Sequence, residues 1–242
     1  NVSNDLRHSF SEVSLFELSS QDLSKYRDKR LTKVTCGTVN RELAILRHCF
    51  EVARKDWGVP LQSNPVANIT IPKPSPARKR RTSPEELQLL LDECKHALLP
   101  SIIRFAIETG MRRGEIVNVR WEDIDFESAT LHIPITKNGH SRTIPLTEGA
   151  VGILSELPKN AERVFPISGN AIRLAWERLK KRVGIVDLRF HDLRHEAISR
   201  FFEMGLSVPE VALISGHRDP RMLFRYTHLR AETVAQKLRS NS

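Results

Sequence analysis

The stretch TLHIPITKNGHSRTIPL at residues 130–146 decides the fold class that the sequence predicts. Its two ends, Thr130 to Lys137 and Ser141 to Leu146, are short β-prone runs, and Asn138-Gly139 between them is a strong signal for a hairpin turn. A third β-prone run, Trp121 to Phe126, precedes them. We therefore expect a small antiparallel sheet within the second half of the chain.

Helical periodicity dominates the rest of this second half. Ser83 is followed by Pro84 and, three residues on, by Glu86, which is a capping box with a first-turn proline that opens a helix through Cys94. Residues 83–242 are predicted to form a mixed α+β domain. Its other predicted helices span residues 100–110, a run that starts at 111, 170–183, 191–204, 207–215, 219–227 and 230–239.

The first 71 residues show helical spacing and no strand pattern. One helix is predicted from Gln21 to Lys33, after a cap-like pair of serines, and another begins after Thr38 as its N-cap and ends near Trp57-Gly58. We therefore expect an all-helical domain at residues 1–71. The whole chain is predicted to be mainly α-helical, with one small antiparallel sheet.

Positive charge is concentrated between the two predicted domains. The chain carries 38 Lys and Arg residues against 29 Asp and Glu, a net charge of +9, with five basic and no acidic residues within 72–82. Three prolines in this segment favour an extended, semi-rigid backbone, which is typical of an interdomain linker. Such a linker either follows a phosphate backbone as a basic strap, or is simply solvated.

Composition also restricts the class of protein. No stretch approaches the roughly 20 apolar residues of a membrane span, and the first residues lack a secretory pattern. Cys36, Cys49 and Cys94 are odd in number and widely spaced, which predicts reduced core thiols. We expect a soluble, cytoplasmic protein. The chain does not begin with Met, which suggests a processed chain or a fragment from which an N-terminal piece is absent.

Four short clusters carry chemically active side chains. They are Thr109-Gly-Met-Arg112-Arg-Gly-Glu115, Thr136-Lys137-Asn-Gly, His191-Asp-Leu-Arg194-His195, and Gly216-His217 followed nine residues later by Tyr226. Each cluster alone has an ordinary explanation, such as a surface ion pair, a turn lysine or a helix cap. Their joint order is far more specific than any single cluster.

In that order the clusters resemble the tyrosine recombinase (phage integrase) family, and the resemblance covers essentially the whole chain. Residues 22–30 and 38–43 also resemble the helical core-binding domain of that family, and 83–242 its DNA breaking-rejoining catalytic domain. The chain has only two tyrosines, and Tyr26 lies far from the other clusters. The resemblance implies a catalytic set of Arg112, Lys137, His191, Arg194, His217 and Tyr226, with Glu115 behind it.

The chemistry of such a set is intelligible from its side chains. A phenol can replace the ribose oxygen at phosphorus and leave again when the reaction reverses. Two guanidiniums, Arg112 and Arg194, suit a bidentate clamp on the nonbridging oxygens, and His217 adds a donor. Lys137 suits protonation of the departing 5′ oxygen. His191 either accepts the tyrosine proton or binds phosphate, and Glu115 orients Arg112 or its helix.

Several basic residues are expected to contact DNA without taking part in the chemistry. Arg113, His195, Arg225 and His228 lie beside the catalytic positions and are interpreted as DNA-contacting or structural. Arg41 lies in the helical half. The predicted DNA-binding residues are Arg41, Arg78, Lys79, Arg80, Arg81 and Arg113.

The resemblance implies a site-specific DNA recombinase that needs no metal, ATP or other cofactor. It would form a 3′-phosphotyrosyl intermediate, exchange strands through a Holliday junction, and act as a tetramer on two DNA sites, a monomer without DNA. A helix at 230–239 would dock on a neighbouring protomer through Val234 and Leu238, or else pack on its own domain. Accessory DNA-bending proteins and the bacterial or phage nucleoid are the expected surroundings.

Three other functions are compatible with parts of the sequence. A metal-dependent nuclease would use Glu122, Asp123 and Asp125, or some of the nine histidines, as ligands. The three carboxylates do not close a coordination sphere, and no H-E-x-x-H or Cys/His set occurs in the sequence. A non-catalytic DNA-binding module would explain the basic strap and leave the four clusters unexplained. A type IB topoisomerase shares the tyrosine chemistry and would relax nicked strands as a monomer.

Overall fold

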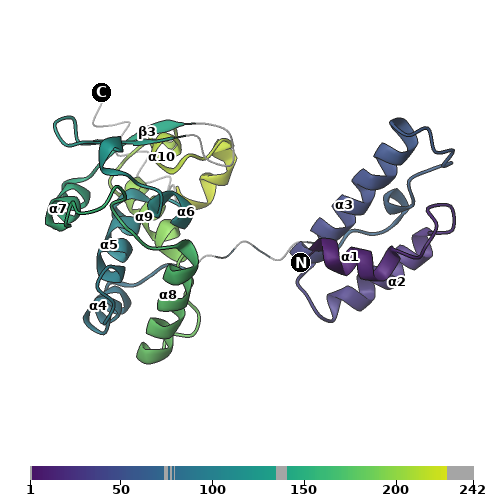
Figure 1. The fold of residues 1–242 in the computed structure, drawn as a ribbon, viewed down its shortest axis with the longest axis horizontal. Helices are drawn as coiled ribbons and strands as arrows, with labels where there is room; N and C mark the ends of the chain where they lie inside the picture. The colour runs from purple at the N-terminus through teal and green to yellow at the C-terminus, as the bar shows by residue number, and fades with distance from the viewer. Residues whose placement is uncertain (1, 74–75, 77, 79, 135–140, 228–242) are drawn as a thin grey trace, which may run out of the picture. The chain divides into compact units, whose positions relative to one another are not determined.

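A computed structural model describes residues 2–73, 76, 78, 80–134 and 141–227 of the chain. The chain divides into two compact units, Asn1–Arg78 and Lys79–Ser242 (Figure 1). Each unit has its own buried apolar cluster. Below, the first is called the helical unit and the second the mixed unit.

The helical unit contains the α-helices α1 (Val2–Phe10), α2 (Ser20–Leu31) and α3 (Cys36–Lys55) and the 3-10 turn η1 (Pro65–Asn68). Both predicted helices are confirmed, but α3 starts earlier than expected, because Thr35 rather than Thr38 is its N-cap. Helix α1 was not predicted. The core of the unit consists mainly of apolar side chains from α2 and α3, among them Leu23, Leu43 and Phe50.

A charged network crosses this helical core. Glu42 on α3 is completely buried, and the Tyr26 hydroxyl on α2 donates to its Oε2 over 2.9 Å. Arg30 donates from Nη2 to Oε1 over 2.6 Å and from Nε to Oε2 over 3.0 Å. Asp5 lies 3.2 Å from the same guanidinium. The buried carboxylate is therefore fully partnered.

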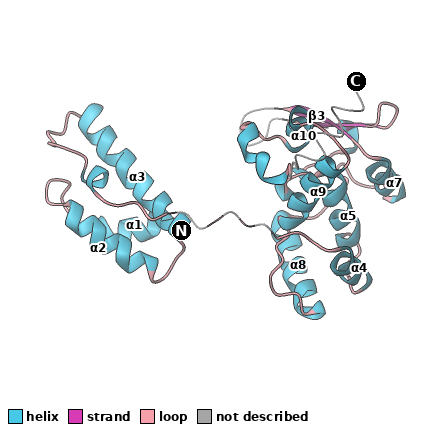
Figure 2. Ribbon diagram, turned by 180° about the vertical axis from the view of Figure 1, so that it is seen from behind, coloured by secondary structure: helices cyan, strands magenta, loops and turns pink. Residues whose placement is uncertain are grey.

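The mixed unit contains one small sheet surrounded by helices. Strands β1 (Ile124–Asp125), β2 (Thr130–Ile133) and β3 (Arg142–Pro145) pair antiparallel in the order β1-β2-β3, which confirms the predicted sheet (Figure 2). The described helices are α4 (Pro84–Asp92), α5 (Leu99–Thr109), α6 (Arg113–Ile116), α7 (Glu148–Glu156), α8 (Gly169–Val183), α9 (Asp192–Glu203) and α10 (Val208–Ser215).

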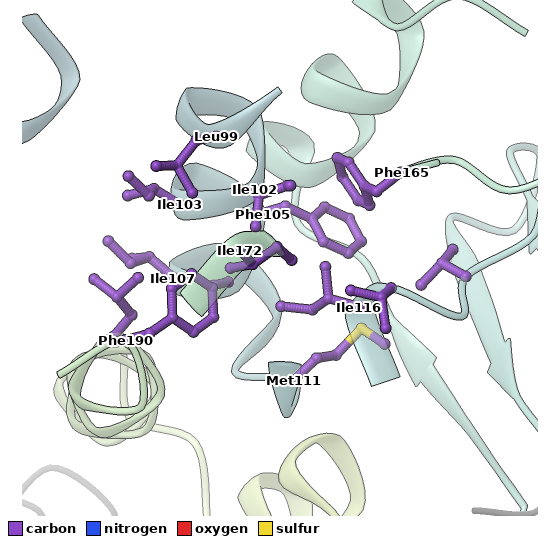
Figure 3. Packing of buried hydrophobic residues seen from close by; sticks show 14 of the residues in the cluster. Leu99, Ile102, Ile103, Phe105, Ile107, Met111, Ile116, Phe165, Ile172 and Phe190 are labelled. Atoms are coloured by element: carbon purple, nitrogen blue, oxygen red, sulfur yellow. The ribbon is translucent and has the colours of Figure 1, made fainter. Parts of the chain in front are cut away.

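Helix α5 is the centre of the mixed core. It contacts α7, α8 and α9, and Phe105 on it packs 5.4 Å from Phe165, measured between ring centroids (Figure 3). Trp176 on α8 meets Phe190 edge to face at 5.5 Å. This packing fixes the positions of two segments that carry the candidate site. One segment follows α5, and the other begins α9.

Several predicted boundaries are wrong. The segment at 219–227 is not one helix but two 3-10 turns, η3 (Pro220–Met222) and η4 (Phe224–Tyr226), since the Asp219 carboxylate accepts the Arg221 N–H and closes a short turn. The run from Trp121 starts with the 3-10 turn η2 (Trp121–Asp123) before β1. Helix α7 was missed, because two glycines weaken its helical signal. The Asn138-Gly139 turn and the helix at 230–239 lie outside the described residues.

The sequence predicts reduced core thiols and no membrane span. All three cysteines are free, but Cys49 is exposed and the other two are only partly buried, so the expectation of core thiols is wrong. No helix in the described part of the chain is long and apolar enough to span a bilayer.

Candidate active site

The first site segment follows directly from the end of α5. Gly110 ends the helix with φ +60°, and a β-carbon there would lie 3.3 Å from the Phe201 ring of α9, so glycine suits both the turn and the close approach. Arg112 then caps α6, and its backbone N–H donates to Glu115 Oε2 over 2.9 Å. The turn at Gly110 and the cap of α6 together fix the position of the Arg112 backbone.

Glu115 holds two arginines from different segments. Arg112 Nη1 donates to its Oε1 over 3.0 Å, while Arg142 on β3 donates to both carboxylate oxygens over 3.1 and 2.8 Å. Burial raises the pKa of Glu115, but these hydrogen bonds outweigh burial, so its pKa lies below the usual value and the carboxylate stays charged. Arg142 Nε also donates to the Ile214 carbonyl over 3.3 Å. Glu115 therefore joins α6, β3 and the end of α10.

Arg194 on α9 is the most deeply buried cation of the site, with 3% of its surface exposed. Its guanidinium donates to the carbonyls of Gly110 and Ser215. Burial, followed by repulsion from Arg112, lowers the pKa of Arg194 to about 9, so it remains protonated at neutral pH. No carboxylate among the described residues forms an ion pair with it. Its charge is left for an anionic ligand.

His217 follows Gly216, which ends α10 with φ +66°. Its Nδ1 lies 2.7 Å from Ser215 Oγ and 3.5 Å from Arg194 Nη2. A guanidinium nitrogen can only donate, so the arginine contact favours a lone pair on Nδ1. Ser215 Oγ donates its single proton to the Val211 carbonyl over 2.6 Å, so the shorter serine contact instead favours a ring proton on Nδ1. Burial and the charges of Arg194 and Arg112 lower the pKa of His217 to about 4. The imidazole is then a neutral donor.

These cations surround one cavity of about 720 Å³. Arginines and histidines dominate its polar wall, and Asp219 is the one carboxylate among its described lining residues. No group of three or more metal-ligating side chains occurs in the described part of the chain. Such a cavity suits a phosphate. Its described wall consists of Arg112, Ser141, Arg142, His191, Arg194, Ala212, Leu213, Gly216, His217, Arg218, Asp219 and Met222.

Tyr226 lies at the end of η4 and is not among the described residues that line this cavity. It leaves 7% of its surface exposed, and its hydroxyl makes a short hydrogen bond to His195 Nδ1. The two rings stack with centroids 5.7 Å apart. Burial raises the pKa of Tyr226, while the charges of Arg225 and Arg194 act in the opposite direction.

His195 therefore lies closer to the predicted nucleophile, Tyr226, than the sequence indicated. Burial, together with His191 and Arg225, lowers the pKa of His195 to about 4, so the imidazole is neutral at pH 7 and has a free lone pair. The ring of His191 lies 5.1 Å away, edge to face. A signal existed in the sequence, because His195 stands four residues after His191 on the same helix face.

The structure brings four of the six predicted catalytic residues to one cavity, with Tyr226 beside His195. Lys137 and His228 lie outside the described residues. Arg142 was not predicted, since a lone arginine on a strand carries no sequence signal for a partner 27 residues earlier. The four residues at the cavity wall are Arg112, His191, Arg194 and His217.

The predicted DNA-binding residues differ in their surroundings. Arg41 on α3 is exposed and Arg113 is partly exposed. Arg80 instead pairs with Glu86, and Arg81 pairs with Glu196, at 2.9 Å, and with Glu203. Two arginines of the expected strap are therefore ion-paired within the mixed unit. Arg78 is described and interacts with its surroundings, whereas Lys79 lies outside the described residues.

The sequence profile of the phage integrase family matches residues 80–233. A shufflon-specific DNA recombinase of Escherichia coli is 46% identical over 234 residues, which cover 92% of this chain and 61% of that protein, so the present chain spans about three fifths of this relative.

Solved structures of low sequence identity share the fold. A crystal structure of a lambda integrase dimer bound to a COC′ core site superposes with a TM-score of 0.79 at 19% identity, covering 93% of this chain and 69% of that one. A lambda integrase tetramer bound to a Holliday junction superposes with a TM-score of 0.74 at 19% identity, over 90% and 70% of the two chains.

Proposed function

The chain belongs to the phage integrase family, and from this premise we propose that it is a site-specific DNA recombinase that cleaves and rejoins duplex DNA. One observation carries the proposal most directly. The Tyr226 hydroxyl is held by a neutral imidazole next to a cavity lined by Arg112 and Arg194, so a nucleophile, a base and two phosphate ligands adjoin one another.

The arginines would bind the scissile phosphate. Arg194 has no carboxylate partner among the described residues, and its buried position strengthens its attraction for an anion. Arg112 shares Glu115 with Arg142, which leaves its 36% exposed guanidinium oriented and still accessible. His217 would add a ring N–H donor. Charge that develops on the nonbridging oxygens then meets fixed cations.

The tyrosine proton would go to His195. The hydroxyl already forms a hydrogen bond to Nδ1 of this imidazole, whereas no hydrogen bond joins Tyr226 to His191 among the described contacts. His191 lines the cavity and would bind a phosphate oxygen. In the step itself the Oη–phosphorus bond forms and the bond from phosphorus to the 5′ oxygen breaks. We assign the protonation of that oxygen to Lys137, on the family pattern.

The products would be a 3′-phosphotyrosyl enzyme and a free 5′-hydroxyl. In the second step this hydroxyl would attack the phosphotyrosyl phosphorus on the partner duplex, the bond from phosphorus to the tyrosine oxygen would break, and the tyrosine would regain its proton. We propose four protomers on two DNA sites with a Holliday junction as the intermediate, supported by the fold shared with the lambda integrase tetramer. The segment at 230–239, with Val234 and Leu238, would dock between protomers. Accessory DNA-bending proteins and the nucleoid of a bacterial or phage-infected cytoplasm complete the proposal.

A nicked suicide substrate incubated with the protein in EDTA tests the covalent step. We expect a protein–DNA adduct from the wild type, because no step of the mechanism uses a metal. Arg112→Lys should slow adduct formation about 10²- to 10³-fold with little loss of DNA affinity. Arg120→Lys, in an exposed ion pair of the same unit, is the matched control. An adduct that requires a divalent cation would contradict the proposal.

A second assay separates recombination from strand relaxation. Two linear duplexes of different length that share the cleavage site should yield recombinant products and a four-way intermediate. A type IB topoisomerase would relax a supercoiled plasmid and give no recombinants. A non-catalytic binding module would give neither outcome.

A further inference from the structure

A second, smaller cavity adjoins the candidate active site. It measures about 330 Å³, and it shares His191 with the larger cavity. Three arginines, Arg113, Arg173 and Arg189, lie in its wall. We propose that this cavity binds a second phosphate of the DNA strand, the one next to the scissile phosphate. The inference rests on the proposed function, because it takes duplex DNA as the ligand.

Charge in this cavity is not neutralised by its surroundings. Among the described contacts, neither the Arg113 nor the Arg189 guanidinium is paired with a carboxylate, although the Arg189 backbone N–H donates to Asp192 Oδ2 over 2.8 Å. The Arg173 guanidinium donates only to the amide oxygen of Asn170, over 3.1 and 2.9 Å. Glu177, the one described carboxylate in the wall, is paired with Lys180 at 3.0 Å. The cavity therefore keeps an excess of positive charge.

The start of helix α8 positions two of these arginines. A β-carbon on Gly169, the first residue of the 15-residue helix α8, would lie 3.7 Å from Arg113 Nε, so this guanidinium lies against the helix N-terminus. Arg173 is tied to the first turn of the same helix through Asn170.

A further hydrogen-bond donor belongs to the same wall. Trp176 is 1% exposed, and its indole N–H has no hydrogen-bond partner among the described residues. Buried donors without partners are rare in folded proteins. Three arginines in one wall, beside an indole N–H without a described partner, favour the oxygens of a phosphodiester over a neutral ligand.

The shared residue decides which phosphate is bound. His191 belongs to the walls of both cavities, so a strand with its scissile phosphate on Arg112 and Arg194 continues past His191 into the smaller cavity. Phosphates on one strand follow at short, regular spacing. The second site would fix the register of the strand relative to Tyr226 without reading any base.

Salt dependence of DNA binding by the full chain tests this site. Arg113→Gln/Arg189→Gln should reduce the slope of log K against log salt by about 1 unit, the share of one phosphate. Arg178 is exposed on helix α8 but lies outside this cavity, so Arg178→Gln should leave the slope unchanged. An unchanged slope for the double variant would overturn the proposal.

Neutral methylphosphonates identify the phosphate. In wild type, replacing the phosphate next to the mapped cleavage position should weaken binding, and the double variant should then lose nothing further. Additive losses at every position, or coupling only to the opposite strand, would overturn the inference. Arg189→Gln alone provides a second, milder variant. If the wild type forms no covalent adduct at all, the proposed function fails instead.

Discussion

Tyr26 in the helical unit and Tyr226 in the mixed unit leave the same 7% of their surface exposed, yet their hydroxyls meet different partners. Tyr26 donates to the carboxylate of Glu42, and burial together with that negative charge raises the pKa of the phenol. Tyr226 meets the neutral imidazole of His195, with the Arg225 guanidinium 4.9 Å from the centre of its ring.

We infer from this difference that the acceptor, rather than the depth of burial, separates a structural tyrosine from the proposed nucleophile. A carboxylate beside the phenol opposes a second negative charge, so Tyr26 keeps its proton. An imidazole can take the proton and become a cation, which then stabilises the phenolate. The arginines near the two tyrosines differ in the same way. Arg30 is matched by Glu42, whereas Arg194 has no carboxylate partner among the described residues.

The largest expected effect is on covalent chemistry. Tyr226→Phe should give no protein–DNA adduct with a suicide substrate, because the phenyl ring offers no oxygen to phosphorus. Tyr26→Phe is the matched control and should form the adduct at the wild-type rate. Adduct formation by Tyr226→Phe, or its loss in Tyr26→Phe, would reverse the roles that the two hydrogen bonds indicate.

Replacement of the imidazole should slow cleavage without abolishing it. In His195→Gln the amide oxygen can still accept the hydrogen bond, but it cannot take the proton, so we expect about a 10²- to 10³-fold slower single-turnover cleavage. His191→Gln should weaken phosphate binding as well, and its effect should grow at low DNA concentration. A wild-type rate in His195→Gln, with slow cleavage in His191→Gln, would move the base to His191.

The sequence indicated which side chains gather at the candidate site better than it indicated their contacts. Arg112, Arg194, His217 and Tyr226 stand in clusters whose order along the chain is visible without a structure. Arg142 joins them only because β3 pairs with β2 beside α10, a tertiary event that spacing does not encode.

Short elements escaped prediction for local reasons. The segment at 219–227 has helical composition, but a side-chain cap and Pro220 close separate 3-10 turns there. Gly149 and Gly152 hid helix α7, which is stabilised by the cap at Thr147 and by packing on α5. Packing and capping therefore overrode local propensity in these two segments.

The network around Tyr26 should matter for stability alone. Glu42→Gln leaves an acceptor for Tyr26 but removes the buried negative charge that faces the partly buried Arg30, which then keeps only Asp5 as a carboxylate partner. We therefore expect the free energy of unfolding to fall by about 2–3 kcal/mol in urea titrations. Arg54→Gln, in an exposed pair of the same unit, should change it by less than ~0.5 kcal/mol. Cleavage by Glu42→Gln at a temperature where it is folded should equal wild type.

Acid should destabilise the mixed unit through its neutral histidines. The pKa values of His195 and His217 are lowered to about 4, below the ordinary value near 6.5, so between these pH values the unfolded chain binds protons that the folded one does not. Stability is therefore present above pH 6.5 and is lost as pH falls towards 4. The melting temperature of His195→Gln/His217→Gln should depend less on pH in this window, whereas the exposed His132→Gln should behave as wild type.

The smallest expected effect is on DNA binding by the basic segment before α4. There too, an arginine that is paired with a carboxylate is not available to bind a phosphate. Arg80 and Arg81 are paired with Glu86, Glu196 and Glu203, as Arg30 is with Glu42. An arginine that stays paired with a carboxylate neutralises little phosphate charge, so few counterions leave the DNA. Arg80→Gln/Arg81→Gln should therefore change the slope of log K against log salt by less than ~0.5 unit, whereas the loss of two unpaired phosphate contacts would change it by about 2 units. Instead, removal of these pairs should lower the melting temperature of the mixed unit. A loss of 2 slope units would show that DNA displaces the glutamates, and would place these arginines on the phosphate backbone.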